Sequence, residues 1–401
     1  MFDPCAAAPK DRIPDRPKKG MGMDLKLNEQ QQMLRDATRE FAEKKLLPQS
    51  EEAEINEGND PALLKELAAM GYCGIGTPEQ YGGAGLDAVS YALMISELSY
   101  GDASVGVTVS VTNSLTQDPI IMFGTEEQKQ RFLPRLASGE VWGGFALTEP
   151  SAGTDSAGTR TTAVLDGDHY VVNGTKNFIT NGGFADIFVV FVRGDTSDKH
   201  AGISAFIVEK GTPGFSIGKK ENKLGIRASS TTELVFEDCR LPKENLLGEW
   251  GGGFKVAMKT LDNGRIGIAA QAHGIAQRAL DLAVKYAKER EQFDRPLAKF
   301  QHLQFRLADM ATDVEASRLL IMQAAWEKDQ GVRHSKAAAM AKLFASEAAH
   351  RVCHQSLQIH GGYGYIKEYE IERLYRDQRI TEIYEGTSEA MRMVISANVL
   401  R

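Results

Sequence analysis

The sequence predicts an α+β fold with an N-terminal helical domain, a central β domain and a C-terminal four-helix bundle. Three observations support this order. Apolar residues recur at helical spacing in the first third of the chain, strand-like runs rich in Val, Ile, Thr, Tyr and Phe begin near Val141, and helical spacing returns after Gly251-Gly252-Gly253. We expect an N-terminal segment, disordered or extended, over residues 1–22, and domains over residues 23–144, 145–250 and 251–401.

The N-terminal domain is expected to begin with a helix. Met33, Ala37, Phe41 and Leu46-Leu47 recur at three- to five-residue steps. Because proline has no backbone N–H and clashes with the preceding turn, we expect this helix to end at Pro48. The same spacing predicts further helices, over residues 62–70, 89–100 and 126–136.

The central domain is expected to be built from short strands separated by Gly, Asn and Asp. The strand candidates are TTAVLDGDHYVVNGTKNFI, DIFVVFV, GISAFIVEK and TELVFEDCR. Asp166-Gly167 lies between two such runs, which predicts a β-hairpin.

The C-terminal domain carries two apolar stripes typical of packed helices. One consists of Ile268, Ala272, Ile275, Ala279, Leu282 and Tyr286, and the other of Phe300, Leu303, Leu307, Met310, Val314 and Ile321. The near-heptad spacing of the second stripe favours a four-helix bundle, with a further contact to another subunit as an open alternative. His350 and His354 lie one helical turn apart, but no third ligand is evident, so we expect no metal site.

Composition excludes several classes of function. The chain of 401 residues has 47 basic and 54 acidic residues and no basic block, which argues against nucleic acid as a partner. The longest strongly apolar run, residues 187–192, is too short to span a membrane. Four widely spaced cysteines favour free thiols and a cytoplasmic location, and residues 1–22 have no apolar signal region. GxGxxG, GxxxxGK[ST] and GxSxG motifs are absent, so a nucleotide cofactor would be held in another way.

Three long motifs identify a family. They are FALTEPSAGTDSAG at residues 145–158, NGTKNFITNGG at residues 173–183 and QIHGGYGYIKEYEIERLYRDQRITEIYEGTSE at residues 358–389. Together they resemble the flavin-dependent acyl-CoA dehydrogenases, and the resemblance extends from about Met23 to Arg401. It implies that the central domain is β-barrel-like, that each subunit binds one FAD, and that the enzyme is a homotetramer.

The resemblance is closest to the short-chain, butyryl-CoA branch. Other branches place the catalytic base at the position of Gly264, where this chain has no side chain, so the base is expected to be Glu385. The implied reaction removes a proton from the carbon next to a thioester carbonyl and a hydride from the following carbon. A carboxylate can do this only if poor solvation raises its pKa and hydrogen bonds stabilise the developing enolate. The family uses the backbone N–H of the base and a ribityl hydroxyl of FAD for those bonds. The alternative is that Glu385 is an acid favoured by the dipole of the last helix.

The resemblance also implies two groups of FAD contacts. Phe145, Leu147 and Thr148 would line the flavin ring, Phe178 would flank it and Thr180 would donate a hydrogen bond to it; a regular β-strand pair is the alternative for the last two. The pyrophosphate and adenosine of a neighbouring subunit's FAD would contact Arg290, Gln292, Phe293, Gln301, Gln358, Gly361 and Gly362. Arginine pairs with phosphate through its planar fork, and paired glycines let amides approach an anion. The alternative is that Arg290 and Gln301 are helical surface residues. Thr387 and Glu389 would also touch FAD.

The substrate contacts are implied in the same way. Thr154 would reach the CoA portion, Leu115 would border the acyl pocket, and Tyr384 and Gly386 would flank the substrate beside the base. Met258, Asp262 and Arg265 would lie along the CoA cleft, with a solvent-facing arginine as the alternative for Arg265.

Three residues depart from the family pattern. Gln117 and Asp118 replace small or apolar residues, and either a polar pocket wall for a functionalised or cyclic acyl group or a solvent-facing helix-end aspartate would explain them. Asp294 replaces a glycine and would place a negative charge near the pyrophosphate.

The resemblance predicts an acyl-CoA dehydrogenase that passes electrons to an electron-transferring flavoprotein. The alternatives are a dehydrogenase of a cyclic or branched acyl-CoA, an oxidase that uses oxygen, and a catalytically silent subunit that binds FAD or acyl-CoA.

Overall fold

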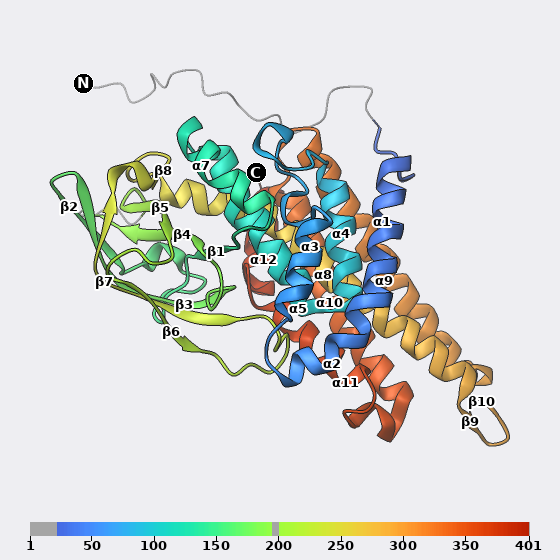
Figure 1. The fold of residues 1–401 in the computed structure, drawn as a ribbon. Helices are drawn as coiled ribbons and strands as arrows, with labels where there is room; N and C mark the ends of the chain where they lie inside the picture. The colour runs from blue at the N-terminus through green and yellow to red at the C-terminus, as the bar shows by residue number, and fades with distance from the viewer. Residues whose placement is uncertain (1–21, 195–199, 401) are drawn as a thin grey trace.

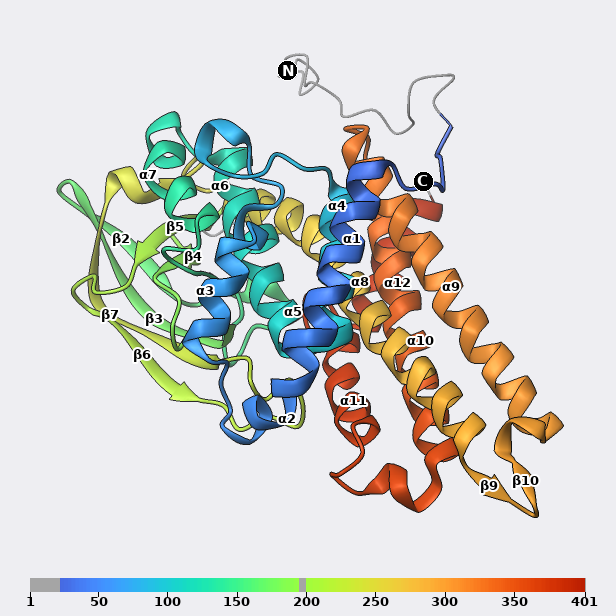
Figure 2. The same ribbon diagram turned by 45° about the vertical axis from the view of Figure 1, so that its right-hand side comes forward.

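The computed structural model describes residues 22–194 and 200–400, so most of the expected N-terminal segment lies outside the described residues. The predicted α+β class and the order of a helical, a β and a second helical part are confirmed. Figures 1 and 2 show the sheet at one end of the molecule, the C-terminal helices at the other, and the N-terminal helices between them.

The N-terminal part is helical throughout. Its helices are α1 (Glu29–Phe41), α2 (Leu47–Ile55), α3 (Pro61–Ala69), α4 (Ala88–Gly101), α5 (Ala103–Ser110), α6 (Asp118–Phe123) and α7 (Glu126–Ala137), with 3-10 segments η2 (Tyr72–Gly74) and η3 (Glu79–Tyr81). The expected helices over residues 62–70, 89–100 and 126–136 correspond to α3, α4 and α7.

The prediction that the first helix ends at Pro48 is wrong. A π-helical segment, η1 (Ala42–Leu46), joins α1 to α2, and Pro48 lies in the first turn of α2, where proline is tolerated. A second π-helical segment, η4 (Val111–Gln117), joins α5 to α6 and carries Leu115. Periodicity alone does not predict such insertions.

The β part forms one eight-stranded sheet in the order β6-β7-β3-β2-β4-β5-β8, with β1 paired in parallel to β4. The strands are β1 (Gly143–Ala146), β2 (Thr162–Asp166), β3 (His169–Thr180), β4 (Ile187–Arg193), β5 (Ile203–Glu209), β6 (Phe215–Lys220), β7 (Thr231–Pro242) and β8 (Leu246–Leu247), with 3-10 segments η5 (Ser156–Gly158) and η6 (Lys243–Asn245). The hairpin predicted at Asp166-Gly167 is confirmed, since Asp166 pairs with His169 across a two-residue turn and Gly167 has a φ of 64°.

The C-terminal part is built on one long helix, α8 (Gly253–Glu289), whose 37 residues span about 55 Å at the usual rise. Around it lie α9 (Gln301–Asp329), α10 (Ser335–His360), α11 (Ile371–Gln378) and α12 (Ser388–Val399), the two-stranded β9 (Glu291–Gln292) and β10 (Arg295–Pro296), and the 3-10 segments η7 (Leu297–Lys299), η8 (Gly361–Tyr365) and η9 (Arg379–Glu382). None of the helices in the described ranges is both long and apolar enough to cross a membrane.

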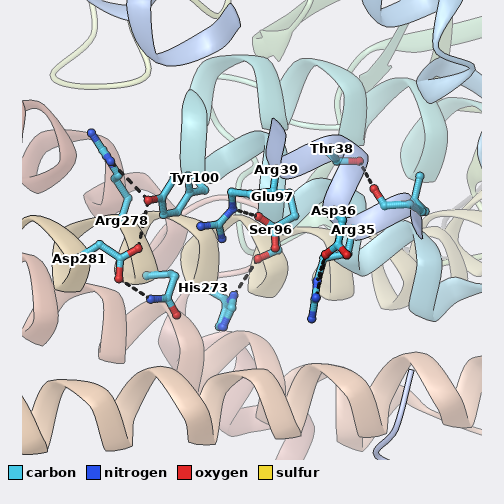
Figure 3. Close-up of polar contacts among 12 residues, drawn as sticks. Arg35, Asp36, Thr38, Arg39, Ser96, Glu97, Tyr100, His273, Arg278 and Asp281 are labelled. Carbon is cyan, nitrogen blue, oxygen red and sulfur yellow. Dashed lines mark hydrogen bonds and ion pairs between the residues drawn. The ribbon is translucent and has the colours of Figure 1, made fainter. Parts of the chain in front are cut away.

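Polar contacts fix the N-terminal helices to α8 (Figure 3). Arg39 of α1 pairs with Glu97 of α4 and lies 3.6 Å above the ring of Tyr100. Ser96 Oγ lies 2.7 Å from His273 Nδ1, and Tyr100 donates a hydrogen bond of 3.0 Å to Asp281. The contacts of Arg39 join α1 to α4, and those of Ser96 and Tyr100 hold α4 against α8.

Candidate active site

Glu385 lies in the turn between η9 and α12. Its φ is 51°, a left-handed conformation that costs a non-glycine residue about 1–2 kcal/mol. Gly386 follows with a φ of 104°, which glycine reaches without steric penalty. The side chain of Glu385 meets α8, whereas the first-turn acid of α12 is Glu389. The helix-dipole explanation of Glu385 is therefore wrong.

Gly264 of α8 leaves the space that the Glu385 carboxylate fills. A Cβ atom on residue 264 would overlap Glu385 Oε2 and lie 3.3 Å from Glu385 Cδ. It would also lie 2.8 Å from Leu115 Cδ2. Glu385, Gly264 and the predicted acyl-pocket residue Leu115 therefore meet at one point.

The environment of Glu385 favours the neutral acid. Its Oε2 atom is buried and has no hydrogen-bond partner among the described residues. Burial raises the pKa of Glu385 to about 7, although the positive charges of Lys342 and Arg265 oppose part of that rise. A carboxyl group with this pKa can take up a proton near neutral pH, as a general base must.

Two tyrosines lie around the carboxylate. Tyr384 donates a hydrogen bond to Gln271, and Tyr91 Oη lies 2.8 Å from Ser110 Oγ. Burial raises the pKa of both phenols, and the charge of Glu385 raises it further, so both keep their protons. These two phenols therefore add no charge beside the carboxylate of Glu385.

Arg265 is buried beside this group. Its guanidinium donates a hydrogen bond of 2.6 Å to Asp262 Oδ1, and Asp262 also accepts one from Ser335. The solvent-facing alternative for Arg265 is therefore wrong. Met258, two turns earlier on α8, packs against an apolar core that includes Ile120, and its role toward CoA stays a prediction.

Gln117 and Asp118 have structural partners. The Gln117 amide donates to the carbonyls of Cys73 and Thr112, at 2.6 Å and 3.1 Å, and accepts from Thr77 at 2.7 Å. This use of the amide argues against a free polar pocket wall.

The solvent-facing explanation of Asp118 is also wrong. Its Oδ2 atom accepts hydrogen bonds from Asn263 at 2.7 Å and from Lys328 at 3.0 Å. Asp118 thereby links η4 and α6 to α8 and α9.

The predicted flavin-ring residues gather where β1 and β3 meet. Phe178 lies in a β-bulge between Lys176 and Ile179, has a φ of 58°, and is 60% exposed. Phe178 therefore leaves the regular ladder, which excludes the plain strand alternative for it, whereas Thr180 pairs with Thr231 in that ladder. The Asn177 N–H donates to the Thr148 carbonyl at 2.9 Å, so the bulge holds the FALTEP segment.

A buried ion pair between Lys176 and Glu149 holds the FALTEP segment in place. Lys176 donates to Glu149 at 2.7 Å and to the Leu147 carbonyl at 3.2 Å. Glu149 accepts from the N–H groups of Arg160 and Thr161. Both residues belong to the family motifs, but reasoning from the sequence missed their part in shaping the ring site.

The β-domain group reaches the base through the N-terminal helices. Asn181, next to Thr180, donates to the Thr108 carbonyl of α5 at 3.1 Å. Leu115 in the following η4 segment contacts the Gly264 position. This chain of contacts connects the predicted ring site with Glu385.

Several predicted pyrophosphate residues line one pocket of about 470 Å³ at the far end of α8. Arg290, Gln292, Gly361 and Gly362 contribute to it, together with Tyr286, Leu297, Ile359, His360, Tyr363 and Ile366. Gln301 and Gln358 are exposed near this end of the bundle, which does not exclude the surface alternative for Gln301. Figure 1 places β9 and β10 at this end, opposite the sheet.

The remaining predicted residues are placed as follows. Phe293 is 88% exposed at the β9–β10 turn, and Thr154 is exposed in the loop after the FALTEP segment. Thr387 is the N-cap of α12 and accepts from the Ala390 N–H at 3.2 Å, while Glu389 is exposed. Their ligand contacts stay predictions.

Lys342 is the other site residue that the sequence reasoning missed. It is fully buried in α10 and donates a hydrogen bond of 2.6 Å to the Gly386 carbonyl. The signal was a single lysine within the otherwise apolar stretch AAAMAKLFA. Within residues 22–194 and 200–400, no cluster of three or more His, Cys, Asp and Glu is placed to hold a metal ion.

Known protein families match the three consecutive parts of this chain. The family models described as the N-terminal, middle and C-terminal domains of acyl-CoA dehydrogenase match residues 28–140, 144–239 and 251–400. The short-chain specific acyl-CoA dehydrogenase of Clostridium acetobutylicum is 52% identical over 379 residues, which cover 94% of this chain and 100% of that protein.

Solved structures agree. Butyryl-CoA dehydrogenase from Megasphaera elsdenii is 50% identical with a TM-score of 0.93, covering 94% of this chain and 100% of that one. A chain in a structure described as electron transferring flavoprotein of Acidaminococcus fermentans is 56% identical with a TM-score of 0.93, at the same coverage. The chain therefore belongs to the acyl-CoA dehydrogenase family of oxidoreductases.

Proposed function

We propose that the protein is an FAD-dependent dehydrogenase that converts a short-chain acyl-CoA, similar to butyryl-CoA, to the trans-2-enoyl-CoA. The observation that carries this proposal is the buried Glu385 carboxylate in the space left by Gly264. Membership of the acyl-CoA dehydrogenase family gives the reaction class and the cofactor. The short-chain assignment follows the relatives, which are named for short-chain and butyryl-CoA substrates.

Glu385 would remove the proton from the carbon next to the thioester carbonyl. Its raised pKa matches this task, and general base action contributes roughly 10²–10⁴ in rate. The Glu385 backbone N–H donates no hydrogen bond to another described residue, and by the pattern of the family it would donate to the thioester oxygen. One such donor is worth about 3 kcal/mol in the transition state. FAD, when bound, supplies the acceptor for the two electrons that leave the substrate.

The chain's own residues fit FAD. Phe178 lies at a bulge and is 60% exposed, so its aromatic ring offers a flat surface for the flavin ring. The Lys176–Glu149 ion pair fixes the loop beside it. The pocket at the other end of α8 combines Arg290 with Gly361 and Gly362, a donor set that suits a pyrophosphate.

The separation of these two groups supports a shared cofactor. Arg265, close to the base, lies 25 residues before Arg290, the C-cap of α8, or about 38 Å at the usual rise. The pyrophosphate residues of one chain would therefore serve the flavin of a second copy. A homotetramer provides such pairs, and the exposed Phe293 and Tyr365 at this end of the bundle are side chains that a second copy would cover.

The proposed electron acceptor is an electron-transferring flavoprotein, which agrees with the description of the Acidaminococcus fermentans structure. We also infer a cytoplasmic location, because Cys73, Cys239 and Cys353 are buried free thiols, as in proteins of reducing compartments.

The proposal is tested by anaerobic titration of the FAD-loaded protein with linear, branched and cyclic acyl-CoA thioesters. Bleaching of the flavin absorbance by butyryl-CoA at lower concentration than by longer or cyclic thioesters is expected. Bleaching by a cyclic or branched thioester alone would replace the substrate assignment, and no bleaching by any thioester would favour a silent binding subunit. Rapid peroxide release in air would indicate an oxidase.

A further inference from the structure

Lys342 is a buried lysine that is hydrogen-bonded to the turn that holds Glu385. The side chain is 0% exposed, and its Nζ donates to the Gly386 carbonyl at 2.6 Å. The other fully buried lysine, Lys176, is neutralised by a carboxylate at 2.7 Å. Among the described residues, no ion pair within 4.0 Å includes Lys342. Burying an ammonium that is held only by a peptide carbonyl is costly, so the fold alone gives no reason for a lysine at this position.

The hydrogen bond acts on a strained piece of backbone. Glu385 has a φ of 51°, and a non-glycine residue keeps such a conformation only where its surroundings enforce it. On the far side of the turn, Thr387 caps α12 and Met391 Cε lies 2.5 Å from the position of a Cβ on Gly386. Lys342 restrains the turn from α10, so the turn that carries the Glu385 side chain is held between α10 and α12.

The charge of Lys342 also reaches Glu385. Burial lowers the pKa of the Lys342 ammonium to about 7, and the carboxylates of Glu385, Glu382 and Glu389 oppose that fall. Arg265 of α8 adds to the fall, because it is a second positive charge nearby. In return, the positive charges of Lys342 and Arg265 favour the ionised form of Glu385.

We propose that Lys342 is a positioning residue for proton abstraction: by holding the Gly386 carbonyl, its ammonium keeps the Glu385 carboxylate in the space beside Gly264. This inference rests on the proposed function, since it assigns Lys342 a part in the same reaction. Lys342 exchanges no proton with the substrate. It acts only through the geometry and the charge state of Glu385.

The test compares Lys342→Met with the wild-type holoenzyme, using butyryl-CoA and a dye acceptor. Lys336→Met, which removes an exposed lysine from the same helix α10, is the matched control. Lys342→Met is expected to keep its FAD and to lose about 10- to 100-fold in kcat, the range for a base displaced by a fraction of an ångström to one ångström. KM is expected to change less than about threefold, because ground-state binding is retained.

The pH profile separates positioning from a merely structural contribution. Removing a positive charge beside Glu385 should move the acidic limb of the kcat/KM profile to higher pH in Lys342→Met. Lys336→Met should leave the limb in place. If Lys342→Met does not retain FAD, Lys342→Gln is measured in its place. Its neutral amide can still donate to the Gly386 carbonyl, so kcat should stay within about threefold of wild type while the acidic limb moves to higher pH, and an unmoved limb would overturn the proposal.

An FAD-loaded variant with wild-type kcat and an unmoved acidic limb would overturn the proposal. A variant that loses thermal stability while its acidic limb stays in place would also overturn it, since Lys342 would then serve only the fold. If the wild-type protein is not bleached by any acyl-CoA, the proposed function itself fails and this inference fails with it. An active wild type beside an unaffected Lys342→Met overturns this inference alone.

Discussion

The carboxylate of Glu385 lies where a side chain on Gly264 would begin, so one volume beside α8 can hold either of them but not both. The two residues are 121 positions apart in the sequence, on α8 and on the turn before α12. The absence of a side chain on Gly264 is therefore what allows the Glu385 carboxylate to lie at the position from which it is proposed to remove the proton.

Gly264→Ala is predicted to inactivate the enzyme without removing its cofactor. The added methyl group would overlap Glu385 Oε2 and crowd Leu115, and displacement of a base by about 1 Å costs on the order of 100-fold in rate. Turnover of butyryl-CoA and the FAD absorbance of the purified variant measure the two effects.

A suitable control is Gly58→Ala, because the nearest atom to a Cβ on Gly58 is 3.9 Å away. Equal rates for the two alanine variants would show that Gly264 does not make room for the base.

The pH dependence of kcat/KM should report the raised pKa of Glu385. Burial raises this pKa from 4.5 to about 7, and only the deprotonated carboxylate can accept the substrate proton. The rate is therefore expected to rise with pH through about 7 and to fall with the deprotonated fraction below it. Because Lys342 titrates in the same range, the midpoint belongs to the pair. An acidic limb near 4.5, the ordinary value, would contradict the buried state of Glu385.

Gln117→Leu is predicted to weaken the fold and leave substrate preference unchanged. The substitution removes the amide's bonds to the Cys73 and Thr112 carbonyls and to the Thr77 hydroxyl, at a cost of about 1–3 kcal/mol for each buried group that finds no other partner. Chemical denaturation gives the loss in free energy of unfolding. The ratio of kcat/KM for linear and cyclic thioesters measures substrate preference. A changed ratio would show that Gln117 does form part of the acyl pocket wall.

The β9–β10 turn offers a test of Asp294. Phe293 and Asp294 both have positive φ values, 54° and 59°, as in a type I′ turn that favours glycine at the second central position. Asp294→Gly should stabilise the turn by roughly 1 kcal/mol and remove a negative charge near the proposed pyrophosphate pocket.

Asp294→Asn removes only the charge and separates the two contributions. Tighter FAD binding in both variants, measured by cofactor dissociation, would identify the charge as the cause. If neither variant binds FAD more tightly, Asp294 does not oppose the cofactor.

The fold could be predicted largely because its signals are local. The hairpin at residues 166–169 and the helices α3, α4 and α7 follow from turn chemistry and periodicity within a few residues. The helix continues past Pro48 because a π-helical turn precedes it. That turn is stabilised by packing, so no local sequence pattern predicts it.

The site was less accessible to sequence reasoning, because its properties arise from tertiary contacts. The motif located Glu385, but its strained φ and its burial against Gly264 depend on α8 and α10. Gln117 and Asp118 were equally ambiguous, since their partners are distant in sequence. Lys342 could have been singled out as a lone lysine in an apolar helix, but its partner, Gly386, lies 44 residues away.

The most direct test of the account is rapid mixing of Glu385→Gln with butyryl-CoA under anaerobic conditions, beside the wild-type enzyme. The amide fills the same space but cannot act as a base, so the variant is predicted to keep its FAD spectrum and to show bleaching slowed by at least about 100-fold. Bleaching at the wild-type rate by an FAD-loaded Glu385→Gln would contradict the assignment of Glu385 as the group that removes the proton.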